Sequence, residues 1–178
     1  NAFRNELAQF EGRDISVWID SYGGSVFAAV SIFNALMKCK NSGAKIVTNI
    51  DGKAMSAATT IFMAGDERNM SPGSVFMMHN PLMGIDSGYA SDFRKYADVL
   101  DTIKKGIMNA YQLATGLDTK TISKFMDNET YMDAATAVKN KFATNILFMG
   151  EEPTATTVMN FSRMPVLNAA KASMKEFY

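Results

Sequence analysis

The stretch KIVTNIDGKAMSAATTIFMAG, residues 45–65, predicts a β-strand that leads directly into a helix. Residues 45–50 form a β-branched run that breaks at Gly52, and the small residues from Ala54 to Ala64 favour a helix. Ser56 falls at this junction, where we expect its hydroxyl to be exposed. The first backbone N–H groups of a helix have no intrahelical partner, so they are free to stabilise an oxyanion.

The sequence contains one histidine, His79, which follows a second strand-like run at residues 74–78. A serine hydroxyl needs an adjacent base before it becomes a good nucleophile, and His79 is the one imidazole that can supply it. Local sequence leaves ordinary alternatives open. A serine among alanines is commonly a packing residue or a helix N-cap, and a lone histidine is commonly a hydrogen-bonded boundary residue.

A glycine pair follows another predicted strand. The run ISVWID, residues 15–20, leads through Gly23 and Gly24 into an apolar helical pattern. A Gly-Gly turn between a strand and a helix lets backbone N–H groups approach a ligand closely. The dinucleotide fingerprint G-x-G-x-x-G and the phosphate-binding G-x-x-x-x-G-K-[ST] are both absent from the sequence, so this turn does not indicate a nucleotide site.

Strand and helix patterns alternate along the chain, which predicts an α/β fold with a mostly parallel sheet. A long helix follows the stretch 81–88, softly broken at Gly106 and ended by Gly116. Asp133 is expected to cap the helix that begins at Ala134, and Asn140 to end it in the left-handed conformation. The predicted elements are helix 3–10, strand 15–19, helix 25–40, strand 45–49, helix 54–64, strands 68–70 and 74–78, and helix 89–115.

Composition predicts a globular intracellular protein. The 178 residues are 47% hydrophobic, which is enough for one domain with a substantial core. The formal net charge is zero and the basic residues are scattered, so neither a nucleic-acid nor a membrane surface is expected. Without a signal peptide or an apolar run of membrane-spanning length, we expect a cytoplasmic location. The single cysteine, Cys39, excludes an internal disulfide, and few soft ligands are available, so we expect neither a metal nor a cofactor.

Four segments together resemble the Clp protease proteolytic subunit, and most closely its phage and prophage branch of ClpP-like head maturation proteases. They are ISVWIDSYGGSV (residues 15–26), GKAMSA (52–57), MMHNPL (77–82) and MDNETYMDAATAV (126–138). The resemblance runs from about residue 3 to about residue 148. It implies a ClpP/crotonase-like fold with parallel-rich sheets, flanking helices and a long handle helix, matching residues 89–115, that pairs two rings.

The resemblance also implies roles for individual residues. Ser56 matches the nucleophile of the family and His79 matches its general base. The Gly23-Gly24 turn and the backbone N–H of Ala57 match the oxyanion hole, with Gly24 favoured as the glycine donor.

The acid that orients the histidine lies in the segment around residues 127–129. Alignment on Ala137-Val138 places the acid of the family on Glu129, and Asp127 is the rival two residues earlier. The sequence also departs from the family pattern: Tyr22 replaces a proline, Met55 a small residue beside the nucleophile, and Lys141 a glycine.

By resemblance, the function expected is a serine endopeptidase that acts through an acyl-enzyme. The expected assembly is a homo-oligomeric ring, the expected substrate a phage capsid or scaffold protein, and an AAA+ unfoldase is a possible partner. Three alternatives stay open: a Ser-Lys peptidase using Lys53, an acyl-CoA enzyme of the same broad fold, and a catalytically silent assembly subunit.

Residues 1–148 are expected to form the peptidase domain, without the first strand of the family. Residues 149–178 are expected to form a polar linker and tail, with a short amphipathic helix from Pro165.

Overall fold

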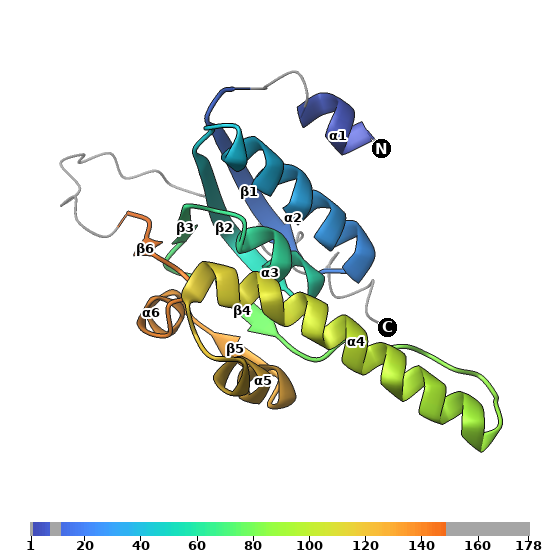
Figure 1. The fold of residues 1–178 in the computed structure, drawn as a ribbon. Helices are drawn as coiled ribbons and strands as arrows, with labels where there is room; N and C mark the ends of the chain where they lie inside the picture. The colour runs from blue at the N-terminus through green and yellow to red at the C-terminus, as the bar shows by residue number, and fades with distance from the viewer. Residues whose placement is uncertain (1, 8–11, 149–178) are drawn as a thin grey trace, which may run out of the picture.

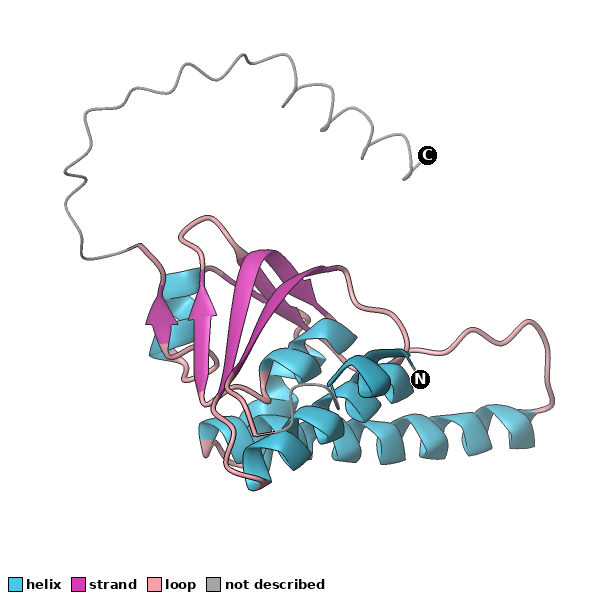
Figure 2. Cartoon of the chain, turned by 90° about the horizontal axis from the view of Figure 1, so that it is seen from above, coloured by secondary structure: helices cyan, strands magenta, loops and turns pink. Residues whose placement is uncertain are grey.

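The computed structural model describes residues 2–7 and 12–148. The predicted α/β fold with a parallel-rich sheet is confirmed, because every strand pairing except β4 with β5 is parallel. Figure 2 shows the strands gathered on one side of the molecule and most of the helices on the other. The elements are α1 Ala2–Leu7, β1 Ile15–Ser21, α2 Val26–Asn41, β2 Ile46–Met55, α3 Ala57–Phe62, β3 Glu67–Met70, β4 Val75–Met78, α4 Ala90–Thr115, α5 Thr119–Asp127, β5 Thr130–Met132, α6 Ala134–Lys139 and β6 Asn145–Ile146.

Strand β2 is the centre of the six-stranded sheet. The strands run in the order β5-β4-β2-β3-β6, and β1 pairs with β2 as well. The prediction that the strand breaks at Gly52 and that a helix begins at Ala54 is wrong. Strand β2 continues to Met55, because β1 and β4 both hydrogen-bond its last residues. A Cβ on Gly52 would lie 2.9 Å from Asp20 Oδ1, at the end of a flexible side chain, and Gly52 lies within the strand rather than in a turn.

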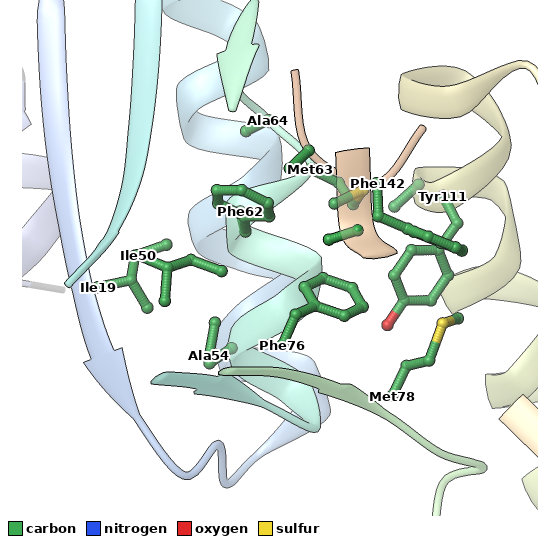
Figure 3. Close-up of a cluster of buried hydrophobic side chains, with 14 of the residues drawn as sticks. Ile19, Ile50, Ala54, Phe62, Met63, Ala64, Phe76, Met78, Tyr111 and Phe142 are labelled. Carbon is green, nitrogen blue, oxygen red and sulfur yellow. The ribbon is translucent and has the colours of Figure 1, made fainter. Parts of the chain in front are cut away.

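The hydrophobic core lies between the sheet and helices α3 and α4. Phe142 is at its centre, with ring centroids 5.4 Å from Phe76, 5.4 Å from Phe125 and 6.0 Å from Tyr111. Figure 3 shows Phe62, Phe76, Tyr111 and Phe142 in one cluster. Burial of each large side chain stabilises the fold by about 1.5–3 kcal/mol. Helix α3 and the C-terminal part of helix α4 are therefore packed against the same core.

Helix α4 is a continuous helix of 26 residues, so the predicted soft break at Gly106 is wrong. A Cβ on Gly106 would meet nothing within 4 Å, so no close contact requires glycine at this position, and glycine costs the helix about 1 kcal/mol relative to alanine. The helix ends at Gly116 with φ 68°, as predicted. Its N-terminal part, together with the loop that precedes it, projects away from the sheet and the other helices (Figure 1). None of the helices in the described ranges is long and apolar enough to cross a membrane.

Helix α6 begins as predicted and ends differently. The Asp133 carboxylate accepts the N–H of Thr136 at 2.7 Å, which confirms the N-cap. Asn140 has φ −92°, whereas Lys141 takes the left-handed conformation with φ 67°, so the predicted C-terminal residue is wrong by one position. Backbone bonds explain the shift: the Phe142 N–H donates to the Ala137 carbonyl at 2.9 Å and the Lys141 N–H to the Val138 carbonyl at 3.0 Å, a Schellman motif in which residue 141 is left-handed.

Elements α5, β5 and β6 were not predicted as separate elements from the sequence pattern. Strand β5 pairs antiparallel with β4 and thereby brings residues 129–132 back to the sheet. Residues 8–10 of the first predicted helix and the whole of 149–178, with the helix expected from Pro165, lie outside the described residues. The division at residue 148 stays a prediction.

Candidate active site

Ser56 occupies the single residue between β2 and α3. Its backbone has φ 53° and ψ −127°, a conformation that costs a non-glycine residue about 1–3 kcal/mol. Three hydrogen bonds hold it there. Its N–H donates to the Met77 carbonyl at 2.8 Å, and its carbonyl accepts the Thr59 N–H at 3.0 Å and the Thr59 hydroxyl at 2.5 Å. This strained conformation therefore persists because hydrogen bonds hold both the N–H and the carbonyl of Ser56.

His79 follows the end of strand β4. Because β4 pairs with β2 in the register Met55 with Met77, the chain that continues to His79 leaves the sheet beside Ser56. His79 Nε2 lies 2.7 Å from Ser56 Oγ. When the imidazole is neutral with its proton on Nδ1, the serine hydroxyl donates to Nε2. The structure thus brings together the two residues that the sequence singled out as a nucleophile and a base.

The Gly23-Gly24 turn packs on this junction. Gly23 has φ 103°, and a Cβ on it would lie 2.6 Å from the Met55 carbonyl oxygen and 2.8 Å from Ser56 Cβ, so only glycine fits. The Gly23 N–H donates to Ser21 Oγ at 3.1 Å. The N–H groups of Gly24 and Ala57 donate no hydrogen bond to any residue in the described ranges, so both can bind an acceptor from outside. Of the two glycines, Gly23 thus has its N–H occupied by Ser21, whereas that of Gly24 is free to donate.

Asp127 is committed to other partners. Its Oδ1 accepts from Lys104 Nζ at 2.5 Å and from Asn80 Nδ2 at 2.9 Å, and its Oδ2 accepts from Ser123 Oγ at 3.0 Å. These bonds, led by that from Lys104, lower the pKa of Asp127 to about 2. Asp127 thus ties α4 and α5 to the residue next to His79, without a bond to His79 itself.

Glu129 lies in the turn that directly precedes strand β5. The last pair of the antiparallel β4–β5 ladder is Met78 with Thr130, so His79 and Glu129 are the residues adjacent to this pair at the same end of the ladder. Glu129 Oε1 accepts from the Tyr131 hydroxyl at 3.2 Å. In residues 2–7 and 12–148, no carboxylate is hydrogen-bonded to His79. The structure therefore joins Ser56 and His79 but leaves both candidate acids bonded elsewhere.

Lys53 is engaged away from the serine. Its Nζ lies 2.8 Å from Asp20 Oδ1 and 4.2 Å from the centre of the Tyr22 ring. The hydrogen bond with Asp20 raises the pKa of Lys53. A lysine that acts as general base must lose its proton near neutral pH, so this environment opposes the Ser-Lys alternative.

Four further residues connect the site to the scaffold. Asn80 and Lys104 bond to Asp127, and Thr59 bonds to Ser56 and, at 2.6 Å, to the Tyr111 hydroxyl. A sequence signal existed for Asn80 alone, because it follows His79 in the quoted motif. No group of three or more potential metal-ligating side chains occurs in the part of the chain that the structure describes.

The fold and this pair define a class of α/β protein that places a serine hydroxyl against an imidazole at a strand-to-helix junction. Residues 7–149 match the Clp protease family. The chain therefore belongs to this family of serine peptidases, and the resemblance found in the sequence is confirmed. The narrower assignment to the phage branch stays a prediction.

The similar curated proteins are proteolytic subunits of Clp proteases. The chain is 32% identical to ATP-dependent Clp protease proteolytic subunit 2 of Borreliella burgdorferi, over 77% of this chain and 70% of that protein. It is 33% identical to the subunit 2 protein of Thermobifida fusca, over 79% and 68% respectively. It is 30% identical to the proteolytic subunit of Porphyromonas gingivalis, over 76% and 60%.

Proposed function

We propose that this chain is a serine endopeptidase in which Ser56 is the nucleophile and His79 the general base. The observation that carries the proposal is the 2.7 Å contact between Ser56 Oγ and His79 Nε2. Family membership supports the same conclusion, because it rests on the whole chain from residue 7 to residue 149 rather than on the two residues alone.

The first half-reaction forms an acyl-enzyme. Ser56 Oγ attacks the carbonyl carbon of the scissile peptide bond while its proton passes to His79 Nε2. The negative charge that develops on the carbonyl oxygen is stabilised by the N–H groups of Gly24 and Ala57. When the intermediate collapses, the C–N bond breaks and the imidazolium gives its proton to the leaving amine. The acyl group then remains as an ester on Ser56.

The second half-reaction returns the enzyme to its starting state. His79 takes a proton from water while the water oxygen attacks the acyl carbon of the ester. The bond between that carbon and Ser56 Oγ then breaks, the imidazolium returns its proton to Oγ, and the carboxylic acid product leaves. We assign the acid that holds the imidazole in the productive tautomer to Glu129; its match to the acid of the family supports this, as does its place beside Thr130, which pairs with the residue before His79. The single side-chain bond of Glu129 within the described chain, to Tyr131, is a long one at an exposed site, so rotation of the glutamate side chain costs little.

The test is labelling with a fluorophosphonate probe, which reacts with activated serines. The wild-type chain is compared with Ser56→Ala, His79→Ala and Lys53→Ala. We expect labelling of the wild type and of Lys53→Ala, none of Ser56→Ala, and a fall of about 10³-fold or more in His79→Ala. Labelling lost in Lys53→Ala and kept in His79→Ala would support a Ser-Lys peptidase. A folded wild-type chain that is never labelled would favour a catalytically silent subunit.

The proposal includes a ring assembly in which α4 serves as the handle. The N-terminal half of α4 projects from the body (Figure 1), and it carries the exposed apolar residues Tyr89, Phe93, Tyr96 and Val99. Native mass spectrometry of the wild type and of a Phe93→Asp, Tyr96→Asp variant tests this. We expect the variant to lose the larger of two assemblies while single rings persist; an unchanged assembly contradicts the handle.

The proposal also covers the substrate and the partner of this chain. The sequence resemblance to head maturation proteases supports a phage capsid or scaffold substrate, and the relatives are named as subunits of ATP-dependent proteases. Mass spectrometry of a capsid precursor and its scaffold, incubated with wild type or with Ser56→Ala, tests the first. Cleavage of an unfolded substrate but not of its folded form in the absence of an ATPase supports a partnership with an unfoldase.

A further inference from the structure

A chain of buried hydroxyl groups links helix α4 to the backbone of Ser56. The Thr59 hydroxyl donates to the Ser56 carbonyl at 2.5 Å, and Thr59 Oγ1 lies 2.6 Å from the Tyr111 hydroxyl. The one hydroxyl hydrogen of Thr59 is used by the carbonyl, so Tyr111 must be the donor to Thr59. The order of donation is therefore Tyr111 to Thr59 to the carbonyl of Ser56.

The groups in this chain are fixed and shielded from water. Tyr111 is 2% exposed and Thr59 is 0% exposed. The Tyr111 ring packs edge-on against Phe142, with 6.0 Å between ring centroids, and Figure 3 shows it inside the core cluster. Burial raises the pKa of Tyr111 to about 12, so its hydroxyl keeps the proton that it donates. Consecutive hydrogen bonds in a low-dielectric interior also strengthen one another.

The carbonyl that receives this chain belongs to a strained residue. With φ at 53°, Ser56 relaxes toward a commoner backbone conformation unless its peptide groups are held, and such a rotation carries Cβ and Oγ away from His79. The N–H of Ser56 is held by the sheet, through the Met77 carbonyl. Its carbonyl is held by Thr59, and Thr59 is held by Tyr111.

We propose that Thr59 and Tyr111 are positioning residues that fix the backbone of Ser56 so that its hydroxyl meets His79. The inference deepens the proposed function and rests on it, and it concerns two residues that do not touch the reacting atoms. Tyr111 acts through Thr59, from a position 52 residues further along the sequence.

The test compares Thr59→Val, Tyr111→Phe and Thr59→Ser, with Thr48→Val as the matched control. Thr48 is an equally buried threonine whose hydroxyl donates to the Phe62 carbonyl at 2.8 Å, at the opposite end of the same helix α3. Peptide hydrolysis gives kcat and KM, and thermal unfolding gives Tm. Because loss of one buried hydrogen bond corresponds to about a tenfold change in an equilibrium, we expect kcat to fall about tenfold in Thr59→Val and about threefold in Tyr111→Phe, at unchanged KM.

The remaining variants test whether the loss of kcat is specific to the Thr59 hydroxyl. Thr59→Ser keeps the hydroxyl and should restore kcat to within about twofold of wild type. Thr48→Val should lower Tm while leaving kcat unchanged. The double variant Thr59→Val, Tyr111→Phe should lose no more kcat than Thr59→Val alone, because Tyr111 acts through Thr59. A kcat that is unchanged in Thr59→Val, or that falls equally in Thr48→Val, overturns the inference.

A second readout separates this inference from the proposed function. His79 is the single histidine of the chain, so its imidazole ¹⁵N signals are unambiguous. We expect the Nε2 signal of Thr59→Val to move toward that of Ser56→Ala, and that of Thr48→Val to stay at the wild-type position. If the wild type hydrolyses no peptide, the proposed function fails, and the Nε2 signals still decide whether Thr59 positions Ser56.

Discussion

Ser56 and Glu129 share an unusual backbone but differ in what surrounds it. Both are non-glycine residues with positive φ, 53° and 45°, and both adjoin strand β4 or its continuation. Ser56 is held on both sides by buried groups, and its side chain meets His79. Glu129 lies in an exposed turn, where its N–H bonds to the Met126 carbonyl at 3.2 Å and its carboxylate meets Tyr131. Strain tied to a buried scaffold fixes a side chain, whereas the same strain in an exposed turn leaves it adjustable.

The largest expected effect concerns Glu129, the residue whose side chain is adjustable. Glu129→Gln should lower kcat by about 10²-fold or more, because the imidazole loses the acid that selects its tautomer. Asp127→Asn is the matched control and should lower kcat less than tenfold, since it weakens the bonds to Lys104, Asn80 and Ser123 but removes no bond to His79. Steady-state peptide hydrolysis measures both. The reverse order of effects assigns the acid to Asp127.

The next largest effect concerns Gly23, which packs against the backbone of Ser56. Gly23→Ala should destabilise the fold by about 3–4 kcal/mol, because the new Cβ combines a strained φ with a contact of 2.6 Å to the Met55 carbonyl oxygen. Gly24→Ala should cost only the backbone strain, about 1–2 kcal/mol, since a Cβ there meets nothing within 4 Å. Urea denaturation of both variants checks the difference. Equal losses would mean that the turn does not press on the serine junction.

A smaller effect measures the free-energy cost of a left-handed backbone conformation alone. Lys141 is a third non-glycine residue with positive φ, 67°, and its place at the end of α6 has no role in the proposed chemistry. Lys141→Gly should stabilise the protein by about 1 kcal/mol, as relief of left-handed strain predicts. Asn140→Gly should not stabilise it, because Asn140 already has φ −92° and donates to the Thr136 carbonyl. Differential scanning calorimetry decides between these outcomes.

The smallest effect concerns pH. The pKa of Asp127 falls from 3.8 to about 2 on folding, mainly through Lys104, so its ionised form favours the folded state. That contribution is present above about pH 4 and is lost as the pH falls toward 2. Because the pair is exposed, the contribution should stay below about 1 kcal/mol. Asp127→Asn should therefore flatten the pH dependence of urea unfolding between pH 4 and pH 2. An identical slope in wild type and variant excludes this linkage.

The sequence predicted the parts of the fold that depend on local patterns. Alternating strand and helix signals identified the α/β class. Gly116 marked the end of a helix because it has no side chain, and Asp133 marked the start of another because its carboxylate can cap it. The positions of Ser56 and His79 followed in the same way, because each comes directly after a strand whose pattern is strong. Their contact needed only the expectation that two such strands pair.

Interactions between distant residues explain the parts that the sequence did not predict. Strand β2 passes Gly52 because two other strands pair with its end, and a local propensity does not record such partners. Thr59 looks like an ordinary small helix residue until Tyr111 is placed beside it. The bonding of Glu129 to Tyr131 rather than to His79 is likewise a property of the folded turn alone.

The pairing of β2 with β4 has a consequence for how this chain tolerates change. Ser56 and His79 are 23 positions apart, yet main-chain bonds between Met55, Ser56 and Met77 set their relative position. The covalent path between them includes an exposed turn at Pro72-Gly73, where a Cβ on Gly73 would meet nothing within 4 Å. This turn keeps the chain continuous but does not set the relative position of Ser56 and His79. Insertions, or even new chain ends in a circularly permuted gene, are therefore best accommodated at this turn, whereas a single added residue within β4 would turn the histidine to the other face of the sheet.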